Sequence, residues 1–560
     1  MSPLSAWRLA RGALPPSRLL SRRPASTLAA SVGRVAERAP SATAVLCSAR
    51  GTAHTYAELA SDAAALRRRL RVSPGGAVAY LLPSSYAYAA TTLAIWQGGG
   101  VAVPLCVSSA APELRHVIGD SGAALVVADP ALRALLGDEA DLGAEVVWLS
   151  CEDALHGGEE EVGSGQRGAL PPHEEDEEEA ESSSAALIIY TSGTTGPPKG
   201  VVHTHTSLLA QAAGLRSAWE WEPADLILNP LPMHHLHGFT NVFLCALLSG
   251  ATVDMQPSFS ALETWRRIAA AVGDERRPTM FFAVPTIYVK LMKEFDAADA
   301  DTQAKWSESA GQMRLMISGS AALPEPVSAR WEAISGVRLL ERYGMTEIGM
   351  ALSNSYGGER VLGHVGLPLP GVEVRIVSDA DGSPIPHSAD GERGDSAAGQ
   401  LQVRGPSVFR EYWNLPEVTA KEFTADGWFK TGDVATVDFS TLNGQEAQPC
   451  YRILGRSSVD ILKSGGYKLS ALDIERDCLE HSSISEIAVL GVADEEWGQR
   501  VMAVVELAED TTLTLGELRE WAKPRMAVYK VPSLLEVVDN IPRNVCIRIP
   551  AVHSLSNPCC

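Results

Sequence analysis

The sequence has few of the features that mark membrane-spanning, nucleic-acid-binding or disulfide-stabilised proteins. Its nine cysteines are odd in number and form no Cys-x-x-Cys pair, which argues against a disulfide scaffold or a zinc site and favours a reducing compartment. No apolar run reaches the roughly 18 to 20 uncharged residues of a membrane span. Basic residues number 47 against 68 acidic ones, and the formal charge of −21 would repel nucleic acid. The 46% of apolar residues predict a globular chain with a large core.

The first 36 residues differ from the rest of the chain in charge. They contain six arginines and no acidic residue before Glu37. This composition is typical of a mitochondrial presequence, and Pro15, Pro16 and Arg18 interrupt any apolar stretch that could act as a secretory signal. We therefore expect residues 1–36 to be a transit peptide and the protein to reside in the mitochondrial matrix. The alternative is an N-terminal segment that is merely disordered.

Residue patterning indicates the organisation of the remainder. Residues 157–184 are rich in Gly and Pro and carry seven acidic residues in eight positions from Glu174 to Glu181, so we expect a disordered acidic loop there. Strand-like runs such as Ala185–Tyr190 alternate with helical stretches such as Tyr56–Leu70. That alternation predicts an α/β architecture. No internal repeat is evident.

A loop rich in small residues directly follows the strand-like run that ends at Tyr190. It reads TSGTTGPPKG and ends at Gly200. Small residues let backbone N–H groups point into one concavity, hydroxyls add donors, and Lys199 adds a cation, a combination that suits a polyphosphate. The loop is neither a Walker A motif nor a Rossmann fingerprint, and the alternative is an ordinary linker. The expected phosphate contacts are Thr191, Ser192, Gly193, Thr194, Thr195, Gly196 and Lys199.

This loop resembles the signature of the adenylate-forming superfamily, which includes acyl-CoA synthetases, peptide-synthetase adenylation domains and luciferases. Further motifs follow in the order typical of that superfamily: Leu231–Gly238, Ser318–Leu323, Glu341–Glu347, Gly427–Asp433 and Gly455–Lys468. The segments GSAALP and LLERYGMTEIGMALS look most like malonate-activating members. The resemblance covers about residues 37–544. It implies a large N-terminal AMP-binding domain of layered sheets and helices, 37–455, and a small mobile α+β C-terminal domain, 456–544.

The resemblance also implies a two-step reaction with ATP, Mg²⁺ and coenzyme A. A carboxylate would attack the α-phosphate of ATP to give an acyl-AMP, and the thiol of coenzyme A would then attack this anhydride. Such catalysis consists mostly of positioning and charge neutralisation. By resemblance the catalytic residues are Thr195, Lys199, Glu347 and His235.

Specific nucleotide contacts follow from the same resemblance. Glu347 would bind Mg²⁺, Asp433 would bind the ribose diol, and Tyr343 would stack on adenine. Their ordinary alternatives are a surface charge, a turn residue and a core aromatic ring. Besides the phosphate loop, the implied ATP and AMP contacts are Gly319, Ser320, Ala321, Tyr343, Gly344, Thr346, Asp433 and Arg456. The hinge would lie at about Ser458 to Asp460, and Gly465 and Gly466 would line the path of coenzyme A.

Two residues are expected to contact the acid. By resemblance His235 gates the acyl pocket, while His234 and His237 are structural. A dicarboxylic acid brings a second carboxylate, which must meet a cation in a partly dry pocket. Arg360 is our sequence-based candidate for that cation, and its alternative is a surface arginine paired with Glu359.

The C-terminal segment departs from the superfamily pattern. The expected ending is Pro-Arg-Asn-x-x-Gly-Lys, whose lysine reaches the α-phosphate and the attacking carboxylate. Here Asn544 is followed by Val-Cys-Ile-Arg, so Arg548 stands where the lysine is expected. Arginine is not an equivalent point charge, and we expect residues 545–560 to be a divergent tail that slows adenylation.

Taken together, the sequence predicts an acid–thiol ligase that forms malonyl-CoA, with methylmalonyl-CoA as a further candidate product, and with impaired adenylation. It acts on small molecules, with no nucleic-acid partner and no membrane span. One alternative is a medium-chain fatty acyl-CoA ligase. Another is a catalytically deficient isoform that only binds nucleotide. A luciferase-like oxidation ranks last.

Overall fold

The computed structural model describes ten segments of the chain, and several sequence predictions fall outside them. The described residues are 27–150, 183–191, 197–270, 277–358, 360–386, 398–440, 448–457, 460–464, 467–494 and 497–541. Outside these ranges lie nearly all of the acidic loop, residues 192–196 of the phosphate loop, Gly465, Gly466 and the divergent tail. Within them, no helix is long and apolar enough to cross a membrane.

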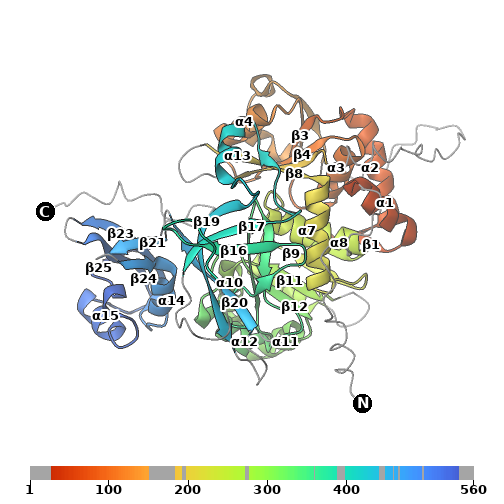
Figure 1. The fold of residues 1–560 in the computed structure, drawn as a ribbon. Helices are drawn as coiled ribbons and strands as arrows, with labels where there is room; N and C mark the ends of the chain where they lie inside the picture. The colour runs from red at the N-terminus through yellow and green to blue at the C-terminus, as the bar shows by residue number, and fades with distance from the viewer. Residues whose placement is uncertain are drawn as a thin grey trace, which may run out of the picture.

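A seven-stranded sheet carries the phosphate-loop strands (Figure 1). Its strands, in spatial order, are β18 (Glu411–Tyr412), β8 (Lys199–Thr204), β7 (Ala185–Thr191), β4 (Val101–Pro104), β3 (Ala77–Leu81), β5 (Leu125–Ala128) and β6 (Glu145–Trp148). Strands β7 to β6 pair in parallel, whereas β8 runs antiparallel to both β7 and β18. The antiparallel β7–β8 pair therefore places the two ends of the loop side by side, at one end of these two strands.

A nine-stranded sheet is separated from the first by a layer of helices. Its strands, in spatial order, are β15 (Leu367–Pro368), β14 (Gly349–Ser353), β13 (Leu340–Met345), β12 (Leu315–Ser318), β11 (Met280–Ala283), β9 (Leu226–Asn229), β10 (Thr252–Met255), β1 (Thr43–Cys47) and β2 (Thr52–Thr55). Its central strands are fully buried and pair in parallel, which explains their continuous apolar runs. One core joins residues of both sheets.

Helices fill the layer between the sheets and cover their outer faces. Helix α3 contacts β4 of one sheet and β1 of the other, and α7 contacts β8 and β14, so both lie between the sheets. The N-terminal helices are α1 (Leu28–Arg38), α2 (Tyr56–Leu70), α3 (Tyr86–Gln97), α4 (Ala111–Ser121), α5 (Arg133–Leu136), α7 (His205–Ala218) and α8 (Cys245–Ser249). Those that follow are α9 (Ala261–Ala269), α10 (Pro285–Ala297), α11 (Ala300–Gly311), α12 (Glu325–Ser335) and α13 (Pro416–Glu422).

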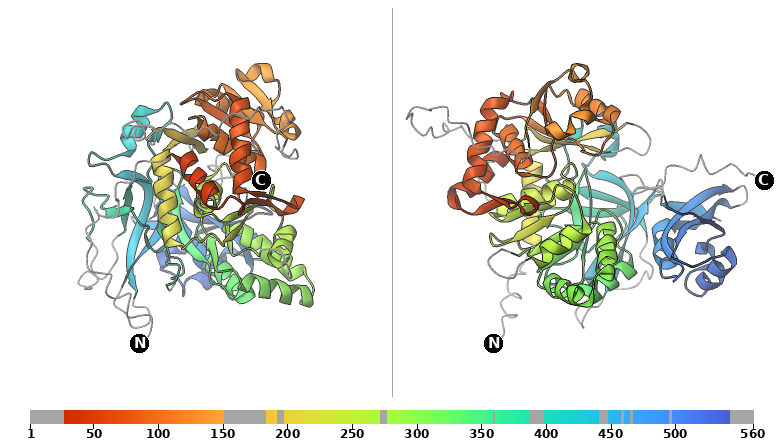
Figure 2. Two further views of the ribbon diagram at one scale, coloured as in Figure 1. Left: turned by 90° about the vertical axis from the view of Figure 1, so that its right-hand side faces the viewer. Right: turned by 180° about the vertical axis from the view of Figure 1, so that it is seen from behind.

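Two smaller sheets complete the chain. The four-stranded sheet has the order β16 (Glu373–Val377), β17 (Gly399–Arg404), β19 (Phe429–Ser440) and β20 (Gln448–Arg456). The C-terminal sheet contains β22 (Tyr467–Ser470), β21 (Ile461–Ser464), β24 (Gly498–Leu507), β23 (Ile484–Asp494) and β25 (Leu534–Val537), with helices α14 (Ala471–Cys478) and α15 (Leu515–Ala522). This last unit has its own core and lies to one side of the molecule (Figure 2). The predicted α/β fold of a large N-terminal and a small C-terminal domain is confirmed.

The first described helix lies within the segment expected to be a transit peptide. Helix α1 begins at Leu28, and its buried face of Leu28, Val32 and Ala36 belongs to the core of the N-terminal domain. The backbone N–H of Leu28 also donates to His205 Nδ1 at 3.3 Å. Residues 28–36 of the expected transit peptide therefore contribute an apolar face to the core of the N-terminal domain.

Asp473 links α14 of the C-terminal domain to β20 of the N-terminal domain. Its carboxylate lies 2.8 Å from Arg452 on β20, 3.2 Å from Arg476 and 3.9 Å from Lys530. Arg476 also lies near the buried Glu341 of β13, whose Oε1 accepts a hydrogen bond from Gly363 at 3.0 Å. Burial raises the pKa of Glu341 to about 7, against the lowering effects of that hydrogen bond and of Arg476.

The raised pKa of Glu341 predicts a pH dependence of stability. Because the folded state binds the proton more tightly than the unfolded state, the free energy of unfolding should fall as pH rises from about 4.5 to about 7 and then level off. Glu341→Gln keeps an acceptor for Gly363 but cannot ionise. Between pH 5 and pH 8, the free energy of unfolding of the natural chain should fall by on the order of 3 kcal/mol relative to that of Glu341→Gln, measured by urea unfolding. Parallel pH curves for the two proteins would contradict this expectation.

A second prediction concerns a buried ion pair between α9 and β10. Arg267 Nε lies 2.5 Å from Asp254 Oδ2, with side-chain exposures of 7% and 0%. Arg267→Met should lower the free energy of unfolding by about 3 kcal/mol, because Asp254 would stay buried without that partner. The neighbouring Arg266 pairs with Glu263 at the same distance but at the surface, so Arg266→Met should cost less than about 1 kcal/mol. Urea titrations followed by tryptophan fluorescence measure the free energy of unfolding of both variants. Equal decreases would show that burial does not set the cost of removing the arginine.

Candidate functional site

A hydrogen bond between Tyr343 and Asp433 brings two distant sequence motifs together. Tyr343 lies on β13 and donates its hydroxyl to Asp433 Oδ2 on β19. Asp433 is 5% exposed, and its backbone pairs with that of Arg456 on β20, so that Arg456 Nε lies 3.3 Å from Asp433 Oδ1. Burial and the Asp433 charge raise the pKa of the Tyr343 hydroxyl, which therefore stays a neutral donor. Three predicted nucleotide contacts thus form one group at the meeting of two sheets.

Glu347, Tyr412 and Lys199 form a second group beside the first. Glu347 is buried, and its Oε1 accepts a hydrogen bond from Tyr412 Oη at 2.9 Å. Burial raises the pKa of Glu347, whereas the hydrogen bond from Tyr412 lowers it. Lys199 Nζ lies 5.4 Å from the centroid of the Tyr412 ring, within cation–π range. A predicted phosphate-binding cation and a predicted metal ligand therefore flank one aromatic ring.

The oxygen donors near Glu347 decide what kind of Mg²⁺ site this region could form. Glu347 offers a hard carboxylate oxygen, as Mg²⁺ prefers. The part of the chain that the structure describes contains no group of three or more His, Cys, Asp or Glu residues that could hold a metal ion. The donor set fits an ion held by one carboxylate together with the phosphate oxygens of a nucleotide, rather than a closed protein site.

His203 anchors the turn that carries Thr346 and Glu347. Its Nε2 lies 2.7 Å from the Thr346 carbonyl oxygen, which only accepts, so Nε2 carries the proton. Burial lowers the pKa of His203 to about 4, which keeps the ring neutral. The Glu347 carbonyl also accepts from the backbone N–H of Phe409 at 2.7 Å. These bonds fix the turn through both of its carbonyl groups.

Gly319 and Ser320 pack against the guanidinium of Arg342. A Cβ at Gly319 would lie 2.5 Å from Arg342, so a larger residue there would displace the guanidinium. Ser320 has a left-handed φ of 68°, and its hydroxyl accepts from Arg342 Nη2 at 3.3 Å. The same hydroxyl lies 3.3 Å from His237 Nδ1. Ser320 therefore links β13 to the histidine motif, while the half-buried Ala321 follows it in the same loop.

Arg342 is the residue that sequence reasoning missed. It is only 3% exposed, and among the described residues no carboxylate lies within ion-pair distance of it. Its Nε has no hydrogen-bond partner within the described ranges, and burial lowers its pKa to about 9. An unpaired buried guanidinium favours an anion beside it. The sequence feature that points to Arg342 is its position directly before Tyr343 in the Glu-Arg-Tyr-Gly-Met-Thr-Glu motif.

Arg360 lies elsewhere. Its guanidinium donates to the backbone carbonyls of Arg338 and Tyr356. Arg338 precedes β13, whereas the nucleotide group lies toward the other end of that strand, at Tyr343. The structure therefore does not bring Arg360 to the group around Ser320, and this placement does not support the predicted contact with a second carboxylate.

The histidine motif also differs in detail from the sequence prediction. His235, predicted to gate the acyl pocket, lies beside His234 with 4.3 Å between the ring centroids and 50° between the ring planes, and burial lowers its pKa to about 3. It is His237, predicted to be structural, that contacts Ser320. His237 opens a π-helical segment, η6 (His237–Leu244), a rare geometry that often marks functional sites.

The other predicted residues have more limited roles in the described structure. Thr191 pairs with Lys199 at the base of the phosphate loop. Gly344 is needed for packing, since a Cβ there would lie 2.1 Å from the Gly349 carbonyl oxygen. The remaining loop residues Ser192, Gly193, Thr194, Thr195 and Gly196, and the proposed coenzyme A residues Gly465 and Gly466, lie outside the described residues.

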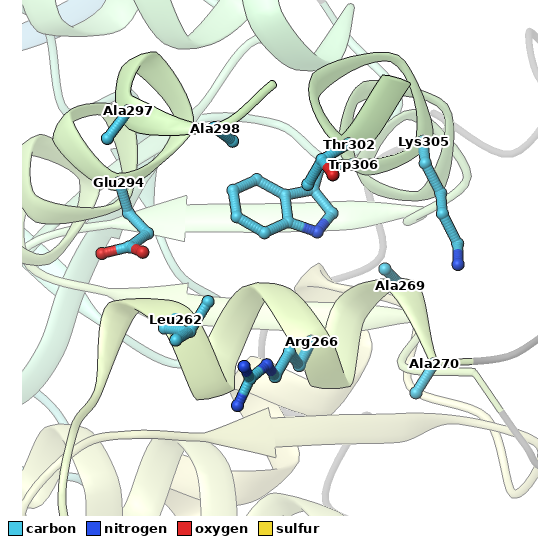
Figure 3. A pocket seen from close by; sticks show the side chains of 10 residues that line it. All are labelled: Leu262, Arg266, Ala269, Ala270, Glu294, Ala297, Ala298, Thr302, Lys305 and Trp306. Atoms are coloured by element: carbon cyan, nitrogen blue, oxygen red, sulfur yellow. The ribbon is translucent and has the colours of Figure 1, made fainter. Parts of the chain in front are cut away.

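A groove of about 450 Å³ lies away from these groups, between α9, α10 and α11. Figure 3 shows the Trp306 indole at its centre, with Arg266 and Glu294 on facing helices. None of its lining residues is a predicted site residue. The groove is therefore separate from the candidate site.

Comparisons with known proteins identify the family of the chain. AMP-binding enzymes match residues 32–413, and the AMP-binding enzyme C-terminal domain matches residues 473–546. Malonate–CoA ligase ACSF3, mitochondrial, of Mus musculus is 43% identical over 521 residues, 88% of this chain and 84% of that protein. ATP-bound MatB from Rhodopseudomonas palustris is 31% identical with a TM-score of 0.78, over 93% of this chain and 97% of that one.

A further solved structure is similar over almost the whole chain. A malonyl-CoA ligase ternary product complex with methylmalonyl-CoA and AMP bound is 34% identical with a TM-score of 0.60, over 94% of this chain and 100% of that one. The predicted resemblance to the adenylate-forming superfamily is thereby confirmed. This chain belongs to the family of AMP-binding enzymes.

Proposed function

We propose that the chain is a mitochondrial matrix ligase that joins malonate to coenzyme A through an acyl-adenylate, with ATP and Mg²⁺. The observation that carries this proposal is Arg342, a buried guanidinium without a carboxylate partner among the described residues, on the same strand as Tyr343. An acid with a second carboxylate would neutralise it. Similar proteins named malonate–CoA ligase, including the mitochondrial one from mouse, support the substrate and the compartment.

The described groups account for the nucleotide half of the reaction. Asp433 would bind the ribose diol and Tyr343, hydrogen-bonded to it, would stack on adenine. Lys199, over the Tyr412 ring, would bind the phosphates. Glu347 would hold Mg²⁺, which when bound neutralises phosphate charge and so favours the departure of pyrophosphate. One acid oxygen attacks the α-phosphorus and pyrophosphate leaves. The thiol sulfur of coenzyme A then attacks the carbonyl carbon, and AMP leaves.

Arg342 is the group that we assign to the second carboxylate, in place of Arg360. Ser320 accepts a hydrogen bond from the Arg342 guanidinium and lies against His237, which limits the rotation of the guanidinium. A planar, fixed guanidinium matches the two oxygens of a carboxylate. Methylmalonate carries the same two carboxylates, and the similar ligase bound to methylmalonyl-CoA and AMP supports it as a further substrate.

We also propose that adenylation by this chain is slow, because Arg548 stands where the superfamily has lysine. The double variant Ile547→Gly with Arg548→Lys restores the Gly-Lys pair. It should form malonyl-AMP about a hundred- to a thousandfold faster than the natural sequence, measured by single-turnover assay with malonate, ATP and Mg²⁺. Both proteins should convert supplied malonyl-AMP to malonyl-CoA at the same rate, since that step does not use the lysine. Equal adenylation rates would show that Arg548 or another group replaces it.

The assignment of Arg342 predicts opposite effects on activity and stability. In the Gly-Lys background, Arg342→Met should lower kcat/KM for malonate about a hundredfold, because the second carboxylate would be buried without a counter-charge. Its thermal unfolding temperature should stay the same or rise, since an unpaired buried charge has been removed. Arg360→Met is the matched control and should change kcat/KM by less than about threefold. If Arg342→Met spares malonate use, or if a medium-chain fatty acid replaces malonate as the better substrate of the unaltered protein, the substrate assignment fails.

A further inference from the structure

Helix α4 carries two side chains, one turn apart, that contact both ends of the phosphate loop. They are His116 and Asp120, at positions i and i+4, which share one face of the helix. The opposite face of α4 packs on the seven-stranded sheet through Leu114 and Ile118. The helix is therefore fixed to the sheet on one side and faces the loop strands on the other.

Asp120 holds the strand that enters the loop. Tyr190, the penultimate residue of β7, donates its hydroxyl to Asp120 Oδ2 at 2.6 Å. The backbone carbonyl of Asp120 accepts from Trp413 Nε1 at 2.9 Å and from Asn414 Nδ2 at 3.1 Å. Both of these residues directly follow β18, so one residue of α4 joins β7 to the segment after β18.

His116 holds the strand that leaves the loop. Its Nε2 lies 3.1 Å from the carbonyl oxygen of Pro198, which only accepts, so Nε2 carries the proton and donates. The imidazole also meets the Tyr190 ring edge-on, with 6.3 Å between the centroids and 85° between the planes. His116 therefore contacts residues on both sides of the loop.

These contacts converge on Lys199. Pro198 directly precedes it, and Lys199 pairs with Thr191 across the β7–β8 ladder. The Lys199 ammonium lies over the ring of Tyr412, whose neighbour Trp413 donates its backbone N–H to the Gly200 carbonyl at 2.7 Å. Contacts with α4 thus fix the backbone on both sides of Lys199 and the segment that carries the Tyr412 ring.

We propose that His116 and Asp120 are positioning residues that hold the Lys199 ammonium in place for the β- and γ-phosphates of ATP; this proposal rests on the proposed function. A lysine side chain has many rotamers, and fixing its backbone and the ring it lies on lowers the entropy lost when it binds an anion. The groups assigned to the nucleoside, Tyr343 and Asp433, lie on other sheets and have no contact with α4 among those described. Loss of the α4 contacts should therefore weaken ATP binding and spare AMP binding.

The test measures the dissociation constants of ATP and AMP with the full chain and Mg²⁺ by titration calorimetry. Tyr190→Phe removes only the hydroxyl that binds Asp120, and His116→Phe keeps a ring but removes the N–H donor. Each should raise the Kd of ATP about three- to tenfold and change that of AMP by less than twofold. His116→Gln retains a donor and should restore most of the ATP affinity. Tyr56→Phe is the matched control, since its buried hydroxyl bonds to Ala251 O at 2.7 Å, far from the loop, and it should change neither Kd.

The outcomes separate this proposal from the proposed function. If the variants leave ATP affinity unchanged, or weaken ATP and AMP equally, His116 and Asp120 are only structural and the proposal is overturned. The proposed function still stands in that case, provided that the unaltered chain binds both ATP and AMP. An unaltered chain that binds neither nucleotide overturns both.

Discussion

The hydrogen bond from Tyr343 to Asp433 connects the nine-stranded sheet to the four-stranded sheet, and the candidate site is arranged around this contact. Both residues lie on regular strands, so sheet pairing sets their positions. Pairing of β19 with β20 places Arg456 beside Asp433, at the end of the last strand before the C-terminal domain. One donor and one carboxylate thus connect two layers of the fold and the junction between the domains.

The site also retains buried polar groups that a core built only for stability would not contain. Arg342 Nε, His237 Nε2 and Ser318 Oγ have no hydrogen-bond partner in the part of the chain that the structure describes. Arg342 and His237 contact the Ser320 hydroxyl, and Ser318 ends the strand that precedes it. Each such group costs free energy on folding. In the proposed function the charged acid would supply partners for these groups, which gives the site a reason to keep them.

Much of the fold followed from the sequence, whereas several contacts could not be predicted from it. Alternating apolar strands and helices indicated the α/β layers, since buried parallel strands require continuous apolar runs. The motif order indicated which strand ends would meet, although not their contacts. Arg360 is predicted from its position after the Tyr-Gly-Met-Thr-Glu motif, where malonate-activating relatives have arginine. In the structure the β13–β14 hairpin returns the chain toward the start of β13, where Arg360 donates to the Arg338 carbonyl. Residues 28–36 were assigned to the presequence by charge, whereas their apolar face packs in the core.

The sequence by itself determined the composition of the candidate site: a loop of small residues with a lysine, an acidic residue after a Tyr-Gly-Met-Thr run, and an aspartate after a glycine turn. These are local properties, because each depends on residues that are neighbours in the chain. Only the tertiary structure decided that Arg342 is buried without a carboxylate partner among the described residues and that His237 contacts Ser320. It also decided that α4 holds both ends of the phosphate loop. Burial and long-range contacts depend on how sheets and helices pack, and no local pattern encodes that packing.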